Sequence, residues 1–326
     1  MTRSAGAGGE MHRHSVLIFL FEGVQALALS GPTDVFSCAN SATVDGRLLY
    51  DVRTVSVDGG AVRASSGLRV QPDASFADVA DVSTLLVPGA DGIPRTGPVT
   101  VRVLGPLARR AERVASVGTG AFLLARTGLL DGCEAVTHWE FTEEFAHRFP
   151  RVTLRPESLV VTDGRIATSA GAASGVDLAL SLVEEDLGRD VAQRTARSLV
   201  TYLRTPGGQA QFAAPRLREA RSPALRGVQL QVFTDPGGDW SLRSLAERAG
   251  VSERHVRRLF RAQVGMTARE YVERVRVDVA ARMLIESARS PDAIARESGF
   301  GNVAAMRRSF LRLLQVPPVE YRNRFS

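Results

Sequence analysis

The sequence predicts two domains of different class: an α/β domain, whose parallel sheet is covered by helices on both faces, and then an all-α domain. The 326 residues are enough for two separate hydrophobic cores. Over the first half, continuous apolar runs alternate with segments of helical periodicity, which is typical of βαβ units and a parallel sheet. The last hundred residues instead combine helical periodicity with a weak internal repeat, which indicates paired helical units.

Four segments of the first half are expected to form parallel strands: residues 16–21, 50–57, 84–87 and 114–117. The first is a continuous apolar run, as in a strand that is buried on both faces. Helices are expected over residues 33–42, after Gly31 and Pro32, and over about residues 99–111. Ligands of such sheets bind outside the carboxyl ends of the strands, so a site is expected in the loops that follow them.

Residues 116–125 have the pattern of a strand, a tight turn and a helix, with Gly118 at the apex of the turn. This geometry points the first backbone N–H groups of the helix at a ligand. Hydrolases of this geometry carry a Ser or Cys nucleophile at the apex, whereas Gly118 has no side chain and excludes covalent chemistry there. All 41 basic residues are Arg, which excludes Schiff-base, Walker-type and lysine-base chemistry as well.

Several motifs of the first half resemble those of one family: LSGPTDVF (29–36), SVGTGAFLLARTGLLDG (116–132), THW (137–139), TSAG (168–171) and GVDL (175–178). They resemble the ThiJ/PfpI, class I glutamine-amidotransferase-like domain. The resemblance is closest to its form in GlxA-type transcriptional regulators, in which the domain precedes an AraC-type DNA-binding region. It implies a flavodoxin-like fold and a first domain over residues 15–190.

Two departures from the family's pattern concern catalysis. The enzymes of the family carry a Cys at the position of Gly118 and an acid at the position of Ala28. His138 matches a histidine near the family's pocket, yet alone it is a poor catalyst, and packing beside Trp139 is the alternative role. We expect no catalytic residue, no cofactor and no metal. A ligand is expected against the backbone N–H groups of the turn and its surroundings, near Gly89, Ala90, Gly118, Thr119 and His138.

The positive charge of the chain is confined to its last part. Residues 226–326 hold 18 Arg against 11 acidic residues, whereas residues 1–225 hold 23 against 24. This asymmetry indicates a polyanion-binding module attached to a neutral one, with a solvated basic surface as the alternative. Residues 1–14 are expected to be disordered. A helix over 190–204, broken at 205–211, and a linker are expected to join the domains across residues 191–225.

An internal repeat of about 50 residues predicts two helix-turn-helix units over residues 226–326. In the first unit, Gly250 supplies a left-handed turn and Ser252 is the expected N-cap of the next helix. Arginines on one face of this helix, opposite an apolar face, suit the major groove of DNA, where Arg reads guanine. The arginines of this face are Arg254, Arg257, Arg258 and Arg261. Viewed down the helix axis, they fall within about 100° of one another. A solvated charged face is the alternative.

Both units resemble the AraC/XylS-type regulator domain, whose closing signature is found in residues 299–302, Arg308, Phe310, residues 317–318 and residues 321–322. Gln315 departs from the pattern, which has Gly there, and at positive φ it costs about 1 kcal/mol. The resemblance implies that base contacts fall on Arg254, Arg257 and Arg258 in the first unit, and on Val303, Ala304, Arg307 and Arg308 in the second. With these, Ser252 and Arg261 complete the set of expected DNA-binding residues.

The leading hypothesis is a cytoplasmic transcriptional regulator that binds double-stranded DNA. Its first domain senses a small-molecule effector, forms a homodimer, or both; RNA polymerase is a further candidate partner, and no membrane is expected. The rivals are a ThiJ/PfpI-type hydrolase or deglycase fused to a DNA-targeting module, and a ligand-free dimerisation scaffold. A reducing cytoplasm fits the two cysteines, and Glu22 and Gln25 interrupt the first apolar run short of a signal peptide.

Overall fold

The computed structural model describes residues 14–42, 49–79, 82–205, 207–212 and 220–325. Contacts divide the chain into two compact units, residues 1–205 and residues 206–326. The segment that we expected to be disordered, residues 1–14, lies outside the described residues except for His14, which begins the first strand. None of the described helices is long and apolar enough to cross a lipid bilayer.

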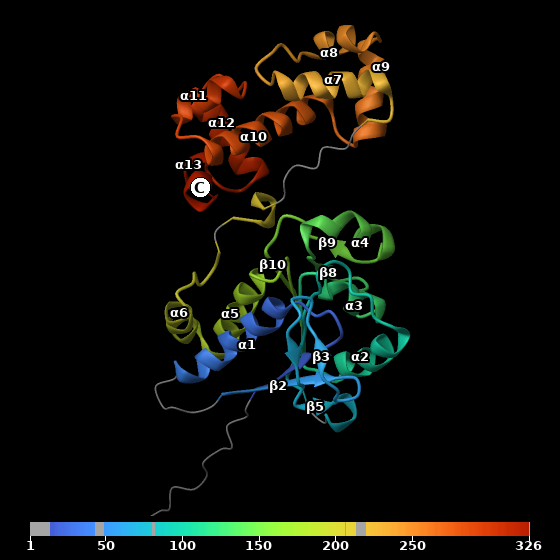
Figure 1. The fold of residues 1–326 in the computed structure, drawn as a ribbon, viewed down its shortest axis with the longest axis vertical. Helices are drawn as coiled ribbons and strands as arrows, with labels where there is room; N and C mark the ends of the chain where they lie inside the picture. Colours follow the sequence, from blue (N-terminus) through green and yellow to red (C-terminus); the bar gives the residue numbers. More distant parts are fainter. Residues whose placement is uncertain (1–13, 43–48, 80–81, 206, 213–219, 326) are drawn as a thin grey trace, which may run out of the picture. The chain divides into compact units, whose positions relative to one another are not determined.

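A seven-stranded sheet forms the centre of the first unit (Figure 1). Its strands are β1 (His14–Phe19), β2 (Tyr50–Ser56), β5 (Ala74–Ser75), β6 (Thr84–Val87), β7 (Arg113–Val117), β10 (Val160–Asp163) and β11 (Ile166–Ser169). They lie in the order β10-β11-β7-β6-β1-β2-β5, and all pairs are parallel except β10 with β11. The order β2-β1-β6-β7-β11 is that of flavodoxin-like folds, which confirms the predicted class.

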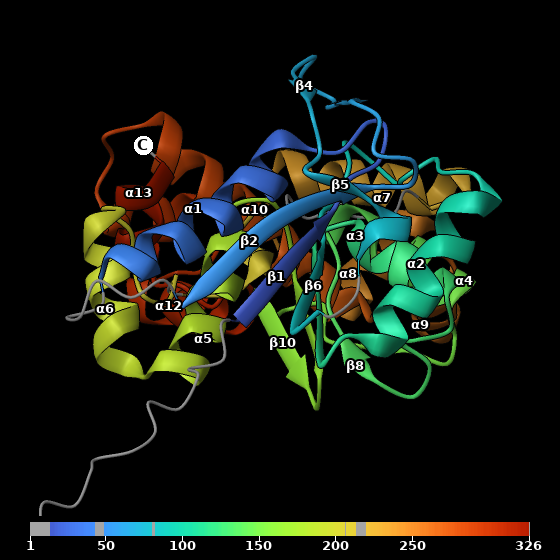
Figure 2. The ribbon, with the colours of Figure 1, turned by 90° about the horizontal axis from the view of Figure 1, so that it is seen from below.

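Helices cover both faces of this sheet (Figures 1 and 2). One face carries α1 (Ala26–Ser41), α5 (Ser174–Leu187) and α6 (Arg189–Ser198), and the other carries α2 (Pro98–Arg110) and α3 (Gly120–Arg126). Smaller elements lie at the edges: α4 (Thr142–Arg148) and the strand pairs β3 (Val62–Arg63) with β4 (Arg69–Val70) and β8 (Glu134–Ala135) with β9 (Thr153–Leu154). The core is the apolar layer between sheet and helices, where Val16, Ile18 and Phe19 are fully buried.

Helix α1 begins seven residues earlier than predicted and runs through Pro32. Proline removes one backbone hydrogen bond of a helix, which is why the sequence favoured a start after it. Tertiary packing outweighs that loss, because Gly31 and Pro32 lie against α5. A Cβ atom on Gly31 would lie 3.1 Å from Val176, and one on Gly175 would lie 3.4 Å from Pro32. Small residues at this crossing therefore let the two helices approach closely.

The helix that we expected over residues 190–204 ends at Ser198. Val200 follows in the left-handed region, with φ of 52°, and Thr201 N–H donates to the Ala196 carbonyl at 3.0 Å. A left-handed residue just beyond the last turn is a standard helix ending. This ending could not be predicted from the residue type, because Val rarely adopts the left-handed conformation.

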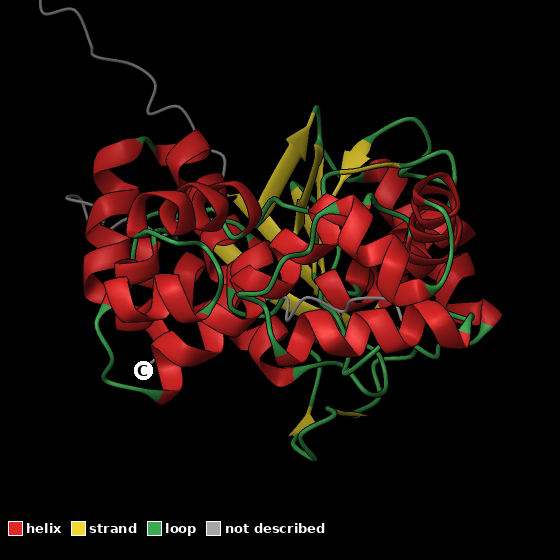
Figure 3. Cartoon of the chain, turned by 90° about the horizontal axis from the view of Figure 1, so that it is seen from above, coloured by secondary structure: helices red, strands yellow, loops and turns green. Residues whose placement is uncertain are grey.

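The second unit contains only helices among its described residues, coloured red in Figure 3. They are α7 (Pro223–Thr234), α8 (Leu242–Ala249), α9 (Glu253–Leu259), α10 (Ala268–Glu286), α11 (Pro291–Glu297), α12 (Val303–Leu313) and α13 (Pro318–Phe325). Helix α10 contributes to two separate cores: its first half packs with α7, α8 and α9, and its second half with α11 and α12. Two helical subdomains thus share one long helix.

The predicted repeat is visible in the packing of these subdomains. Phe260 packs on Tyr271 with ring centroids 5.4 Å apart, and Phe310 packs on Tyr321 at 5.8 Å. The turn between α8 and α9 is left-handed at Gly250, with φ of 66°. Each subdomain therefore closes its core with the same aromatic pair, and the second domain is the predicted pair of helix-turn-helix units.

Gln315 lies just beyond α12 with φ of 58°, so the turn does require the left-handed conformation. We expect Gln315→Gly to raise the free energy of unfolding of the second unit by about 1 kcal/mol, because Gly adopts positive φ without the clash of a Cβ atom. Urea unfolding in a Trp139→Phe background, in which Trp240 fluorescence reports on the second unit alone, measures this change. Gln315→Ala keeps the Cβ atom and serves as the control, and equal stability of the Gly and Ala variants would contradict the assignment of strain.

Candidate nucleic-acid interface and ligand cavity

The turn between β7 and α3 has the predicted elbow geometry. Gly118 stands at its apex with φ of 55°, and α3 begins two residues later. Glycine is also required beside it: a Cβ atom on Gly120 would lie 2.2 Å from the Val87 carbonyl oxygen, and one on Gly89 would lie 2.8 Å from the Val117 carbonyl oxygen. The loop after β6 is thereby held against the elbow.

The predicted ligand residues lie on these two loops and on one more. Thr119 joins the first two, since its hydroxyl accepts from Ala90 N–H at 3.0 Å and contacts the Ala90 carbonyl oxygen at 3.2 Å. Gly89, Gly118 and Thr119 are buried, and Ala90 is half-buried. The elbow N–H groups are therefore covered by protein.

His138 packs beside Trp139 and Phe141, with ring centroids 5.4 Å and 5.8 Å away. Its Nδ1 accepts a hydrogen bond from the Glu140 backbone N–H at 3.3 Å, so it caps a short helical turn. Burial lowers the pKa of His138, which keeps the ring neutral at pH 7. These contacts match the packing role that we weighed for this residue.

A cavity of about 920 Å³ opens next to the elbow. It is lined by residues that follow β1, including Glu22 and Gly23, and by residues 90–95, which follow β6. Strands β1 and β6 are neighbours in the sheet, and the strands that follow each of them are added on opposite sides. Open α/β sheets bind ligands at such a topological switch point. Ala90 is the predicted ligand residue that lines this cavity; Gly89, Gly118, Thr119 and His138 are not among its lining residues.

Three arginines and three acids surround the cavity. Arg126 is held by the carbonyl oxygen and hydroxyl of Thr96 at 3.2 Å and 3.1 Å, and Arg148 pairs with Glu144 at 3.1 Å. The sequence analysis missed this lining, which consists of Glu22, Asp91, Arg95, Arg126, Glu144 and Arg148 besides smaller residues. No sequence signal joins these positions, because they come from four separate segments. Among the described residues, no group of three or more His, Cys, Asp or Glu could hold a metal ion.

In the second unit, the first predicted recognition helix is α9. The Ser252 hydroxyl accepts from His255 N–H at 3.3 Å, as an N-cap does. Arg254, Arg257 and Arg258 are exposed on α9, and Val256 is fully buried on the opposite side. The Arg257–Glu253 pair is long, 3.7 Å, and exposed, so it holds the guanidinium only weakly.

Arg261 does not continue the regular face that we predicted. The chain passes into a π-helical turn, Phe260–Val264, which ends at Gly265 with φ of 82°. A π-turn places successive side chains at smaller angular steps than an α-helix does. Arg261 remains exposed and lines the same cavity as Arg257.

The second predicted recognition helix is α12, capped by the Asn302 side chain, which accepts from Ala305 N–H at 2.8 Å. Ala304, Arg307 and Arg308 are exposed. Val303 is half-buried and packs against the second core, so its contact surface for a ligand is smaller than that of its neighbours. The exposed groups of α12 thus offer two guanidiniums and one methyl group.

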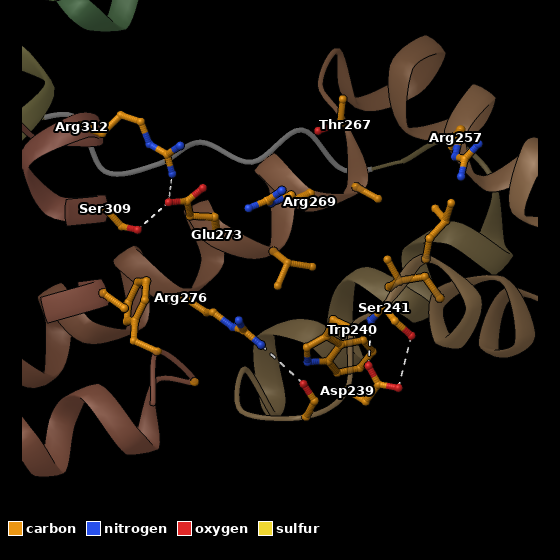
Figure 4. Close-up of a pocket in the computed structure, with 18 of the residues that line it drawn as sticks. Asp239, Trp240, Ser241, Arg257, Thr267, Arg269, Glu273, Arg276, Ser309 and Arg312 are labelled. Carbon is orange, nitrogen blue, oxygen red and sulfur yellow. Dashed lines mark hydrogen bonds and ion pairs between the residues drawn. The ribbon is translucent and has the colours of Figure 1, made fainter. Parts of the chain in front are cut away.

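A cavity of about 1190 Å³ separates the two helix-turn-helix subdomains (Figure 4). Arg257 reaches it from α9, Arg261 from the π-helical turn that follows α9, and Arg308 from α12. The sequence analysis missed Arg269, which lines it from the first turn of α10, and did not place Arg312 there. Figure 4 shows Arg257, Arg269 and Arg312 around this cavity. A concave basic surface of this kind suits a polyanion.

Each of the two units matches a known protein family or domain. The model of the DJ-1/PfpI family matches residues 14–185, which is more than half of the chain. The chain belongs to the DJ-1/PfpI family. A helix-turn-helix domain model matches residues 245–324 of the second unit. A DJ-1/PfpI domain is therefore followed by a helix-turn-helix domain in one chain, as the motif resemblance implied.

Relatives of this DJ-1/PfpI chain include regulators and an enzyme. The HTH-type transcriptional regulator GlxA of Rhizobium meliloti (strain 1021) is 30% identical over 302 residues, which are 91% of this chain and 92% of the relative. Isonitrile hydratase of Pseudomonas putida is 34% identical over 180 residues, 53% of this chain and 72% of the relative. The crystal structure of an AraC family transcriptional regulator from Pseudomonas putida matches with a TM-score of 0.52 and 24% identity, over 57% of this chain and 99% of that one. This match shows the fold.

Proposed function

We propose that this DJ-1/PfpI chain is a DNA-binding transcriptional regulator that acts in the cytoplasm. Residues 226–326 bind double-stranded DNA, residues 15–190 sense a small molecule, form a homodimer, or both, and residues 191–225 join the two. The observation that carries this proposal is the pair of capped helices, α9 and α12, which present exposed arginines to one cavity. The regulator GlxA, which matches over most of both chains, supports it.

Selection from a pool of random double-stranded DNA tests the DNA-binding proposal. The full chain should enrich sites with two short conserved boxes about one helical turn apart, because two recognition helices enter successive major-groove turns about 34 Å apart. Failure to enrich any sequence over the starting pool would overturn it. A homodimer should enrich two such sites in tandem or inverted, since dimerisation doubles the contacts and raises avidity. RNA polymerase is a further proposed partner of the DNA-bound form.

Effector binding is proposed at the cavity beside the elbow, because it lies at the switch point of the sheet and carries both charged and apolar groups. A thermal-shift screen of amino acids, quaternary amines and nucleotides tests this. A ligand that raises the melting temperature of the wild type should do so less in Arg95→Ala, which alters the lining, than in Arg69→Ala, which does not. A flat response to every compound would favour a pure dimerisation scaffold.

We expect no turnover of amide, isonitrile or glyoxal substrates, because Gly118 and Ala28 replace the nucleophile and the acid that the enzymes of the family carry. Product formation by the purified full chain, followed by chromatography, measures this. The matched variants are His138→Ala in the loop after β8 and His147→Ala on α4. Turnover by the wild type that survives in His147→Ala and disappears in His138→Ala would establish the rival reading, an enzyme fused to a DNA-targeting module.

A further inference from the structure

One face of α10 connects the two helix-turn-helix subdomains at the point where their cores meet. Val275 is the last buried residue of α10 in the first core, and Val277 is the first in the second core; the half-buried Val279 still packs against the first core. Arg276 lies between them, and Glu273 lies one turn earlier on the same side of the helix. Both side chains line the cavity between the subdomains (Figure 4).

Arg276 binds the first subdomain. Its Nε donates to the Pro236 carbonyl oxygen at 2.9 Å and its Nη2 to the Gly238 carbonyl oxygen at 3.4 Å, both in the loop between α7 and α8. The second subdomain meets this loop at Gly299, where a Cβ atom would lie 2.3 Å from the Pro236 carbonyl oxygen and 2.8 Å from Arg276 Nε. Backbone from both subdomains is thus packed around one guanidinium.

Glu273 binds the second subdomain. Its carboxylate accepts a hydrogen bond from the Ser309 hydroxyl and forms an ion pair with Arg312, and both of these residues lie on α12. The Glu273 side chain is 19% exposed and that of Arg312 62%, so only the carboxylate side of this pair is shielded from solvent. Arg276 and Glu273 therefore hold the first subdomain and α12, respectively, on adjacent turns of one helix.

We propose that Arg276 and Glu273 are positioning residues that set the separation of α9 and α12, so that the protein accepts DNA sites of a single box spacing. The inference rests on the proposed DNA binding. One base pair moves the next box by about 3.4 Å and rotates it by about 36° around the duplex axis. To follow such a shift of the second box, α12 would have to move relative to α9. That movement would break the hydrogen bonds of Arg276 and the contacts of Glu273 with α12.

The test is random-DNA selection with the full chain, read as the distribution of spacings between the two boxes. The wild type should give a single spacing. Arg276→Ala and Glu273→Ala should recover the same two boxes at two or more neighbouring spacings, because the recognition helices remain and their separation is released. Arg274→Ala is the matched control: it removes one exposed arginine from α10 without touching the junction, and should keep the single spacing.

The outcomes separate this inference from the proposed function. No enriched sequence with the wild type overturns DNA binding itself. A single, unchanged spacing in both Arg276→Ala and Glu273→Ala overturns the positioning role, as does equal broadening in Arg274→Ala. Circular dichroism shows whether each variant is folded at the selection temperature. If Arg276→Ala is unfolded, Glu273→Ala decides alone, with Glu273→Gln expected between it and the wild type because its amide oxygen still accepts from Ser309.

Discussion

Replacing Arg257 and Arg258 together with alanine should strongly weaken sequence-selective DNA binding. Each bidentate Arg–guanine pair is worth about 1 to 3 kcal/mol of discrimination, so the double variant should lose about 2 to 6 kcal/mol, or from about 30-fold to about 10⁴-fold in affinity for its selected site. Both side chains are exposed on α9, whose fold depends on Val256 and the Ser252 cap instead. Fluorescence anisotropy with the selected site and a scrambled duplex, at one fixed salt concentration, measures the change.

Arg109→Ala combined with Arg110→Ala is the control for this prediction. It removes the same charge from exposed positions on α2 of the first unit. We expect it to leave the preference for the selected site over the scrambled duplex unchanged. The base-reading role of α9 would be wrong if the Arg257/Arg258 variant lost affinity equally for both duplexes, because a purely phosphate-directed contact weakens all sequences alike.

Asp186→Ala should destabilise the first unit by about 3 kcal/mol or more, because it strands a buried cation. Asp186 binds Arg113 with both carboxylate oxygens, at 2.9 Å and 2.7 Å, and accepts from the Tyr50 hydroxyl at 2.8 Å. The Arg113 and Asp186 side chains are only 14% and 9% exposed. Burial and the adjacent Asp186 carboxylate raise the pKa of Tyr50, so its phenol stays protonated and donates to Asp186 at neutral pH. Glu185, 3.5 Å from Arg113, is the acid that remains.

Urea unfolding in a Trp240→Phe background measures this effect, since Trp139 fluorescence then reports on the first unit alone. The matched control is Asp51→Ala, which breaks the exposed pair between Asp51 and Arg53 at 2.8 Å. An exposed pair contributes about 0 to 1 kcal/mol, so the control should change the free energy of unfolding little. Similar losses in Asp186→Ala and Asp51→Ala would show that burial does not set the strength of the Arg113–Asp186 pair.

Local patterns predicted the parts of the fold that depend on neighbouring residues. Val16 and the residues after it form a buried strand because a continuous apolar run needs cover on both faces. Gly250 and Ser252 mark a turn and a helix start through their own backbone and side-chain preferences. The short strands β10 and β11 were missed, because their pairing is decided by β7 and by each other rather than by a local pattern.

The candidate sites likewise include features that a local pattern predicts and features that depend on distant contacts. The exposed arginines of α9 follow from helical periodicity, so the sequence predicted their face; the π-turn at Phe260 altered only where Arg261 lies. Of the predicted ligand residues, only Ala90 lines the cavity next to the elbow. The elbow motif drew attention to Gly118 and Thr119, yet the structure buries both, and the open space lies beyond β1 and β6. Which loop covers an elbow depends on contacts between distant segments.

The sequence by itself determined the two-domain plan, the loss of the nucleophile at Gly118 and the concentration of positive charge in the last hundred residues. These are properties of residue identity and short-range spacing. Only the tertiary structure decided that Arg276 and Glu273 join two subdomains and that Asp186 meets Arg113 and Tyr50. The physical reason is that such bonds form between segments tens of residues apart, and no local pattern records which buried charge meets which partner.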